Sequence, residues 1–315
     1  MRPVRTAFAG ALLGTLVLTG CGQNSTTTTP SPASSTGSTG STAYPVTVEA
    51  ANGKVTIAKK PERIVSLSAS HTETLFAIGA GPQVIAVDDQ SNYPAGVPKT
   101  DLSGFKPNVE AIVAQKPDLV VVSNDIDKVV AELGKLNVPV LLEPAATKLD
   151  EAYDEITDLG AATGNTDKAG QVVTGMKTAL DKLAANAPKG KKLTYYHELD
   201  QTPYAATSST FIGQIYGMFG LTNIADKAPD PAGGYPKLSA EFVAQADPDL
   251  IFLADVKCCQ QSRDTLAKRP GWKGLSAIKS DQVIQLDDDL ASRWGPRVVD
   301  LAQSISDAVA KAATR

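Results

Sequence analysis

Two histidines, His71 and His197, are the residues whose type and position most directly suggest metal chemistry. Each follows the first predicted strand of its half of the chain. Neutral imidazole is a good donor to iron and cobalt, so one histidine from each side could ligate a metal between the halves. In the other interpretation, His71 hydrogen-bonds within its own half and His197 packs beside Tyr196. The spacing of Ser70 and Glu73 resembles a capping box, which predicts His71 in the first turn of a helix whose dipole disfavours imidazolium.

The three cysteines divide into one near the amino terminus and one adjacent pair. Cys21 directly follows an apolar run over residues 7–18, which is too short to cross a bilayer of ~30 Å and indicates a secretion signal. Leu18-Thr-Gly-Cys21 resembles the lipobox of bacterial lipoproteins, in which the cysteine thiol is acylated; the alternative is an ordinary signal peptide and a chance cysteine. For Cys258 and Cys259 we expect a vicinal disulfide in an oxidising exterior. Free thiols in a packed loop and a soft-metal contact are the alternatives.

Serines and a run of aspartates raise the question of an enzyme. Ser66, Ser68 and Ser70 precede His71, but the sequence has no Gly-x-Ser-x-Gly elbow, and adjacency in sequence does not set triad geometry. The aspartates at 287–289 lack the alternating spacing of a cation loop, and no Walker lysine motif occurs. We therefore expect no catalytic activity. A lipid-anchored hydrolase or metal-dependent enzyme is the alternative, and an extracellular adhesion module is a third interpretation.

Length and charge limit the remaining possibilities. The chain has 315 residues and a net charge of −4, from 34 acidic and 30 basic side chains. That length predicts about two domains with substantial cores. The charge argues against a nucleic-acid binder, which needs a basic excess to offset phosphate repulsion. The uncharged stretch 22–43, rich in Ser, Thr, Gly and Pro, predicts a flexible tether behind the anchor.

Beyond residue 45, short apolar strands alternate with amphipathic helical stretches. This order predicts parallel sheets covered by helices on both faces. The halves repeat a pattern in which a glutamate opens a helix and Pro-Asp follows seven residues later, before an apolar strand: Glu110 with Pro117, and Glu241 with Pro248. A helical pattern begins near Asn165 and ends before Pro188, long enough to join two lobes. We predict a signal peptide over 1–20, a tether over 21–45, lobes over 46–163 and 189–315, and a linking helix over 164–188.

Five motifs carry a resemblance to a known family. The chain resembles the helical-backbone (class III) substrate-binding proteins of ABC importers, within the group that carries vitamin B12, ferric siderophores and haem. The resemblance covers about residues 46–308. The motifs are Arg63-Ile-Val-Ser-Leu-Ser-Ala-Ser-His-Thr-Glu73, Ser91-Asn-Tyr-Pro94, Asn108-Val-Glu110, Lys116-Pro-Asp-Leu119 and Trp294-Gly-Pro-Arg297.

The resemblance implies an α/β fold of two Rossmann-like lobes, with mostly parallel sheets, a long backbone helix and the ligand cleft between the lobes. It implies a monomer on the extracytoplasmic face of the membrane, with no resident cofactor, metal site or nucleic-acid partner. The expected ligand is a metal chelate: cobalamin or another corrinoid, a ferric siderophore or haem. The expected partner is a permease with its ATPase subunit, contacted through Glu110 and Glu241; the alternative is that both glutamates only complement their helix ends.

Ligand contacts are expected at the carboxyl ends of the strands, where open α/β sheets place their sites. Aromatic side chains there would supply flat apolar walls for a planar macrocycle, although packing explains any one tyrosine equally well. Tyr235 stands where the vitamin B12 binder has a tryptophan, which leaves the ligand open. The expected ligand-binding residues are Ser70, His71, Tyr93, Phe105, His197, Tyr204, Tyr235, Arg293 and Trp294, with Glu198 and Arg297 nearby.

Overall fold

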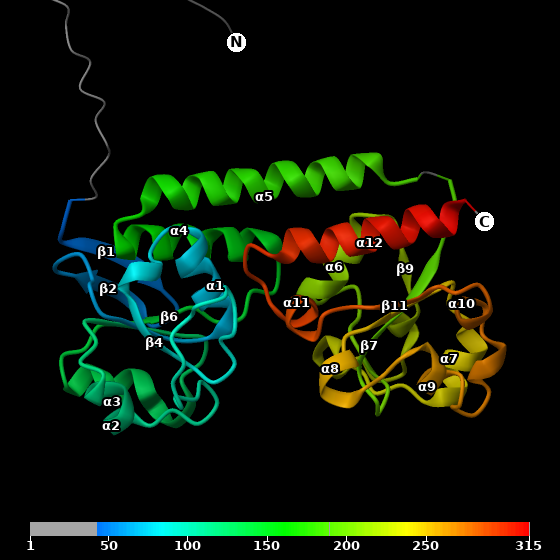
Figure 1. The fold of residues 1–315 in the computed structure, drawn as a ribbon, viewed down its shortest axis with the longest axis horizontal. Coiled ribbons are helices and arrows are strands. Elements are labelled where there is room, and N and C mark those ends of the chain that lie inside the picture. Colours follow the sequence, from blue (N-terminus) through cyan, green and yellow to red (C-terminus); the bar gives the residue numbers. More distant parts are fainter. Residues whose placement is uncertain (1–42, 189, 315) are drawn as a thin grey trace, which may run out of the picture. The chain divides into compact units, whose positions relative to one another are not determined.

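The computed structural model describes residues 43–188 and 190–314, which belong to a unit spanning Gly40–Arg315. The expected signal peptide, Cys21 and nearly all of the tether lie outside the described residues. Within the unit, two lobes are each built on one larger sheet, the N-terminal lobe also carries a two-stranded hairpin, and a long helix connects the lobes (Figure 1). No helix in the described part of the chain is both long and apolar enough to cross a membrane.

The N-terminal lobe is built on four parallel strands in the order β4-β3-β5-β6. Its central strands β3 and β5 are buried along their whole length, as their largely apolar sequences predicted. The elements of this lobe are β1 (Val46–Ala50), β2 (Gly53–Ile57), β3 (Ile64–Leu67), α1 (Ala69–Ala77), β4 (Val84–Val87), α2 (Val109–Ala114), β5 (Leu119–Val122), α3 (Val129–Lys135), β6 (Val140–Leu142) and α4 (Leu149–Thr163).

The hairpin of β1 and β2 was not predicted from the sequence. It pairs antiparallel and joins the lobe beyond β6, where the amide nitrogen of Ala51 donates to the carbonyl oxygen of Leu142 at 3.0 Å. The side chain of Asn52 donates to the carbonyl of Val140, also at 3.0 Å. The turn of the hairpin therefore supplies hydrogen bonds to the exposed edge of the sheet.

The C-terminal lobe has a mostly parallel sheet in the order β11-β10-β7-β8, with β9 beside the start of β7. Only β8 runs antiparallel to its neighbour. The elements are β7 (Thr194–Asp200), β8 (Tyr204–Ala205), α6 (Phe211–Gly217), β9 (Thr222–Asn223), α7 (Ala240–Ala246), β10 (Leu250–Leu253), α8 (Val256–Cys259), α9 (Arg263–Leu266), α10 (Ser276–Lys279), β11 (Val283–Gln285), α11 (Asp288–Ser292) and α12 (Val298–Ala313).

The two lobes repeat one structural device around their Pro-Asp turns. α2 and α7 are each followed by a residue with positive φ, Lys116 at 53° and Asp247 at 41°, which ends the helix before the proline. The next aspartate then fastens the start of the neighbouring strand: Asp118 accepts from the amide of Arg63 at 2.8 Å, and Asp249 from the amide of Thr194 at 2.8 Å. The repeat seen in the sequence is thus a repeat in structure.

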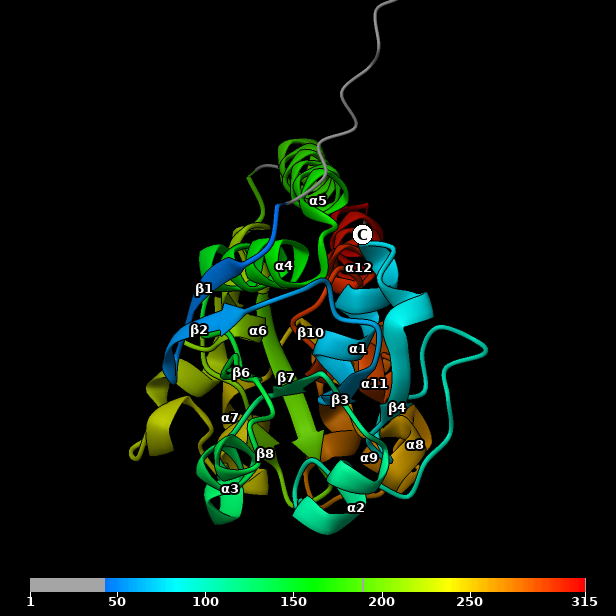
Figure 2. The same ribbon diagram turned by 90° about the vertical axis from the view of Figure 1, so that its left-hand side faces the viewer.

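The linking helix is α5 (Thr166–Asn186), which lies where the sequence predicted it. It contacts α4 of the N-terminal lobe and α12 of the C-terminal lobe, and runs along both (Figures 1 and 2). Met176 and Leu180 are its buried side chains at midlength. Because each turn of this helix is held by the i to i−4 backbone hydrogen bonds, the connection resists bending more than extended linkers would.

Candidate functional site

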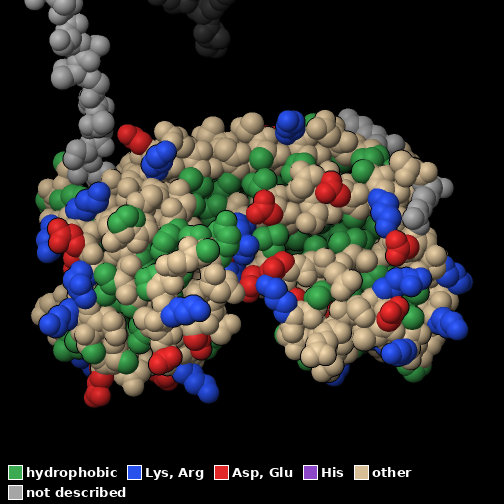
Figure 3. Space-filling view, in the orientation of Figure 1, with side chains coloured by type: hydrophobic (Ala, Val, Ile, Leu, Met, Phe, Trp, Pro, Cys, Tyr) green, Lys and Arg blue, Asp and Glu red, His purple; other side chains and the backbone are tan. Residues whose placement is uncertain are grey.

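A pocket of about 220 Å³ lies between the lobes, at the carboxyl ends of β3, β4 and β5. Figure 3 shows the hollow between the lobes, with acidic and basic side chains gathered at its head. A whole drug-sized ligand needs roughly 300–1,000 Å³, so this volume fits one part of a larger molecule. The lining residues are Leu67, Ser68, Ala69, Ser70, Asp88, Gln90, Gly104, Phe105, Ser123 and Asn124 from the N-terminal lobe, and Asp289, Ser292, Arg293 and Trp294 from the C-terminal lobe.

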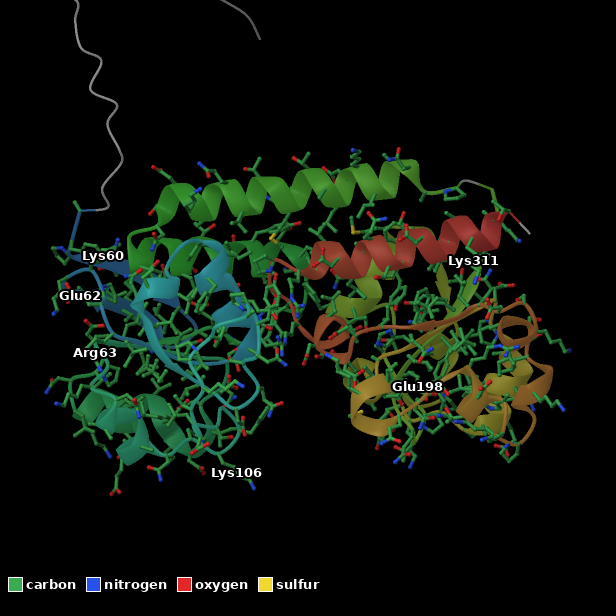
Figure 4. All side chains as sticks on the ribbon, viewed as in Figure 1. Lys60, Glu62, Arg63, Lys106, Glu198 and Lys311 are labelled. Atoms are coloured by element: carbon green, nitrogen blue, oxygen red, sulfur yellow. The ribbon has the colours of Figure 1, made fainter. Side chains whose placement is uncertain are left out.

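Four of the expected ligand-binding residues meet in this pocket: Ser70, Phe105, Arg293 and Trp294. Phe105 is 67% exposed, so its ring is available to a ligand. Its loop also carries Lys106, which lies at the lower margin of the N-terminal lobe (Figure 4). The exposed aromatic ring and the indole of Trp294 give the pocket flat apolar surface from both lobes.

Arg293 is engaged by protein groups. Its guanidinium donates to the carboxylate of Glu73, to the carbonyl of Gln90 at 3.0 Å, to Asn92 Oδ1 at 3.0 Å and to Asp289 Oδ1 at 2.9 Å. Three of these four acceptors belong to the N-terminal lobe. Arg293 therefore connects the lobes at the floor of the pocket, in addition to lining it.

Glu73 is the centre of this interlobe connection, a role that was not predicted from the sequence. Its side chain is 1% exposed and also accepts from Arg297 Nε at 2.9 Å and Nη2 at 3.0 Å. The expected capping box was wrong: Ser68 is the N-cap of α1, without a side-chain cap hydrogen bond, and the carboxylate of Glu73 faces the two arginines. The sequence did contain a signal for this role: two arginines, Arg293 and Arg297, flank Trp294-Gly-Pro. Buried arginines need an acidic partner, and Glu73 is that partner.

The three expected tyrosines do not line this pocket. Tyr93 lies in a neighbouring pocket of about 310 Å³, where the guanidinium carbon of Arg297 sits 4.1 Å from its ring centroid. Tyr204 lies on β8 of the C-terminal lobe, with Lys237 Nζ 5.7 Å from its ring centroid. Tyr235 is 42% exposed, and partial burial raises the pKa of its hydroxyl. All three keep exposed ring surface, as contact with a ligand requires.

His71 does not face the pocket, contrary to its expected ligand-binding role. Its side chain is 1% exposed, because its position on α1 points toward α4, where its Nε2 lies 3.2 Å from Glu155 Oε2. Its ring also packs edge-on against Trp294, with ring centroids 5.9 Å apart. The interpretation that His71 hydrogen-bonds within its own half describes this arrangement.

His197 is likewise enclosed, contrary to the same expectation. It lies in the middle of β7, fully buried, with its Nδ1 2.8 Å from the hydroxyl of Tyr216 on α6. Burial lowers the pKa of its imidazole to about 4, so the ring is neutral at pH 7. Within the described residues, no group of three or more His, Cys, Asp and Glu side chains is arranged to hold a metal ion.

The expected disulfide is absent from the structure: Cys258 and Cys259 are both free thiols. They are the last two residues of the single-turn helix α8. Burial, the neighbouring Cys259 thiol and the charge of Asp288 raise the pKa of the Cys258 thiol. The alternative of free thiols describes this arrangement.

The two glutamates expected to contact the permease occupy equivalent positions. Glu110 lies in the first turn of α2 behind the N-cap Asn108, and Glu241 in the first turn of α7 behind the N-cap Ser239. In both helices the N-cap side chain accepts from the amide three residues later, at 3.0 Å and 3.1 Å. Both glutamates are exposed, and α2 and α7 lie on the side of the unit away from α5 (Figures 1 and 2). The pair can therefore contact a large partner.

Comparison with known proteins agrees with this architecture. The family model described as periplasmic binding protein matches residues 64–290, which include both sheets and the linking helix. The chain belongs to this family. Its predicted fold, two α/β lobes with mostly parallel sheets joined by one helix, is confirmed.

Three similar proteins illustrate the range of the family. An ABC transporter substrate-binding lipoprotein of Bacillus subtilis, YvrC, described as uncharacterized, is 30% identical over 315 residues, covering 96% of each chain. A cobalamin-binding protein of Halobacterium salinarum is 30% identical over 268 residues, covering 82% of this chain and 72% of that one. The crystal structure of a possible iron-binding (periplasmic solute-binding) protein from Staphylococcus epidermidis is 27% identical, with a TM-score of 0.69, covering 80% of this chain and 99% of that one.

Proposed function

We propose that this chain is an extracytoplasmic lipoprotein that captures a metal chelate and delivers it to the permease of an ABC importer. The observation that carries the proposal is the interlobe pocket, in which Phe105 and Trp294 present aromatic surface beside polar groups from both lobes. The similarity to a cobalamin-binding protein and to a possible iron-binding protein supports a metal chelate as the ligand. Cobalamin or another corrinoid is the first candidate, followed by a ferric siderophore and haem.

The dimensions of the pocket suggest how such a ligand binds. A macrocycle is larger than the pocket, so it would enter by one edge and rest its face on the exposed ring of Phe105, which belongs to the N-terminal lobe. Trp294 would face it from the C-terminal lobe. In this arrangement His71 and His197 pack in the interior of the lobes and do not ligate the metal.

Binding is tested by incubating the purified protein with cyanocobalamin, haemin and ferric citrate, separately, and measuring absorbance spectra and melting temperature. We expect one of the three to change its spectrum and raise the melting temperature, since a ligand that binds only the folded state stabilises it by mass action. Phe105→Ala should weaken that response. Leu136→Ala is the matched control, because Leu136 is also an exposed apolar side chain, at 52%, and is not among the pocket residues. Equal responses of the two variants would contradict the assignment of the pocket.

Delivery rests on Glu110 and Glu241, and is tested separately. The variant Glu110→Ala, Glu241→Ala should abolish stimulation of the permease ATPase in proteoliposomes and leave ligand binding intact. Glu49→Ala, Glu132→Ala is a control that removes the same charge from other positions, the exposed Glu49 and Glu132, whose side chain is 43% exposed. Unchanged stimulation by the first variant would refute the docking role and leave the helix-end interpretation.

The membrane anchor is a further part of the proposal. Cys21 would carry lipid, and residues 22–43 would connect it to the folded unit. A Cys21→Ala variant expressed in a bacterial host should appear in the soluble extracytoplasmic fraction, whereas the unchanged chain should stay with membranes. Equal membrane association of the two would refute the anchor.

A further inference from the structure

The pocket between the lobes leaves few strong hydrogen-bond donors free for a ligand. Both terminal nitrogens of the Arg293 guanidinium donate to protein acceptors, one of which is the carboxylate of Glu73. The indole Nε1 of Trp294 donates to Glu155 Oε2 at 2.8 Å, and the amide nitrogen of Trp294 donates to Ser70 Oγ at 3.3 Å. A buried anionic group needs such donors to replace the water that it loses. The strongest donors of the pocket are therefore already used within the protein.

Asp88 has the opposite character, because it is a buried carboxylate with a free acceptor oxygen. It directly follows β4, is 4% exposed and lines the pocket. Its Oδ1 accepts from the hydroxyl of Ser91, whereas its Oδ2 accepts no hydrogen bond from the described residues. Oδ2 lies beside the pocket wall, since a Cβ on Gly104, another lining residue, would be 3.3 Å from it. A ligand in the pocket can therefore donate to Asp88 Oδ2.

The basic groups around the pocket are paired with other carboxylates. Asp289, the second acidic residue of the lining, pairs with Arg293 at 2.9 Å and with Lys257 at 3.0 Å. Arg293 is also paired with Glu73. Among the ion pairs of the described residues, none includes Asp88. The pocket therefore has a surplus of negative charge, and this surplus lies at Asp88.

The surroundings of Asp88 act on its ionisation in both directions. Burial raises the pKa of Asp88, and the charge of Asp89 adds to that rise. The hydrogen bond from Ser91 and the charge of Arg293 lower it, so both contacts favour the ionised carboxylate. Lys106 is exposed and is not among the lining residues, so water and salt screen its charge.

We propose that the pocket selects chelates that enter it by an uncharged or cationic edge carrying hydrogen-bond donors, and that Asp88 determines this specificity. The inference rests on the proposed function and narrows it. A ligand amide can donate to Asp88 Oδ2 through its N–H and accept from the hydroxyls of Ser68 and Ser123 in the same lining. A ligand carboxylate would lose water, find no unpaired cation and be repelled by Asp88. Amide-bearing corrinoids and hydroxamate siderophores meet this requirement, whereas the polar groups of ferric citrate and haem are carboxylates.

Matched pairs of ligands test the inference in the unchanged protein. Cyanocobalamin is compared with its isomeric monocarboxylic acids, in each of which one peripheral amide is hydrolysed. Ferrioxamine B is compared with its succinylated form, in which a carboxylate replaces the ammonium group. Haemin and ferric citrate complete the set, and isothermal titration calorimetry gives each dissociation constant. We expect cyanocobalamin or ferrioxamine B to bind most tightly, and a carboxylate counterpart to bind roughly tenfold or more weakly, because like charges are brought together where water is largely excluded.

Two substitutions test whether Asp88 is responsible for the discrimination. Asp88→Asn keeps the shape of the side chain and an acceptor for Ser91 but removes the charge, so it should remove most of the difference within the pair. Asp89→Asn is the matched control, because it removes the same charge from the next residue, which is exposed and is not among the lining residues. It should leave the difference intact. Circular dichroism confirms that each variant is folded; if Asp88→Asn is not, the ligand pairs in the unchanged protein still decide the inference.

The outcomes separate this inference from the proposed function. Haemin or ferric citrate binding more tightly than both cyanocobalamin and ferrioxamine B would overturn the inference and leave the proposed function standing. Equal binding within the matched pair, or an unchanged difference in Asp88→Asn, would have the same meaning. If no chelate binds, the proposed function is refuted, and the inference that rests on it is refuted as well.

Discussion

Replacing Glu73 is the perturbation whose energetic effect follows most directly from the structure. The carboxylate of Glu73 is 1% exposed and accepts from two guanidinium groups, those of Arg293 and Arg297, which are 7% and 20% exposed. Removing one partner of a buried ion pair costs roughly 3–5 kcal/mol, because the remaining charge stays buried without compensation. In Glu73→Gln the amide keeps the shape but lacks the charge and one acceptor.

Two features of the site place the loss toward the lower end of that range. Arg293 retains Gln90, Asn92 and Asp289 as acceptors, and Arg297 is partly exposed and stacked on Tyr93. We therefore expect the free energy of unfolding of Glu73→Gln to be lower by about 3 kcal/mol.

Equilibrium unfolding in urea, followed by circular dichroism, measures this difference. Glu132→Gln provides the matched control, since Glu132 pairs with Lys135 at 2.6 Å while both side chains are exposed. An exposed pair of this kind contributes about 0–1 kcal/mol. If Glu73→Gln loses no more stability than Glu132→Gln, the interlobe cluster is not the energetic connection described here.

Three further predictions concern single positions. Burial lowers the pKa of His197 to about 4, so on acidification the unfolded chain is protonated at this residue before the folded chain is. The free energy of unfolding should therefore fall as the pH drops from about 6.5 toward 4. Urea titrations of His197→Gln should show a smaller fall. An identical pH slope in both proteins would contradict this. A Cβ on Gly213 would lie 2.0 Å from the carbonyl oxygen of Thr207, so Gly213→Ala should lower the free energy of unfolding by about 1–3 kcal/mol in the same urea assay. Gly217 is on the same helix, and a Cβ there would have nothing within 4 Å, so Gly217→Ala should be neutral or stabilising. Equal effects of the two substitutions would show that the backbone around Thr207 moves to accommodate the added methyl group. Reduction should leave the intact mass of the protein unchanged, since Cys258 and Cys259 are free thiols. A gain of two hydrogens on reduction would instead show that the two cysteines form a disulfide.

The strands and helices were largely predictable because their signals are local. β4, β5 and β10 have the bounds that their apolar sequences gave, and α5 ends where Pro188 follows. The Pro-Asp repeat was also visible, because it is a fixed spacing within each lobe. The β1–β2 hairpin was missed, since its place in the fold depends on hydrogen bonds to β6, some 90 residues away.

The sequence predicted where the site lies in the fold, but it predicted only some of the residues that line it. Strand ends located the pocket, since parallel strands bring their carboxyl ends to one edge. Sequence could not tell which way a side chain points from α1 or from the middle of β7, and so both histidines were assigned to the ligand although the fold buries them. Glu73 and Glu155 were missed for the same reason: their partners, Arg293 and Trp294, lie more than 130 residues away in the chain.

Titration of the purified protein with cyanocobalamin, haemin and ferric citrate, followed by absorbance, tests the central claim most directly. The proposed function predicts saturable binding of one of these chelates, weakened by Phe105→Ala and unaffected by Leu136→Ala. Saturable binding of none of them, or binding that both substitutions leave unchanged, would contradict the claim that the interlobe pocket receives a metal chelate.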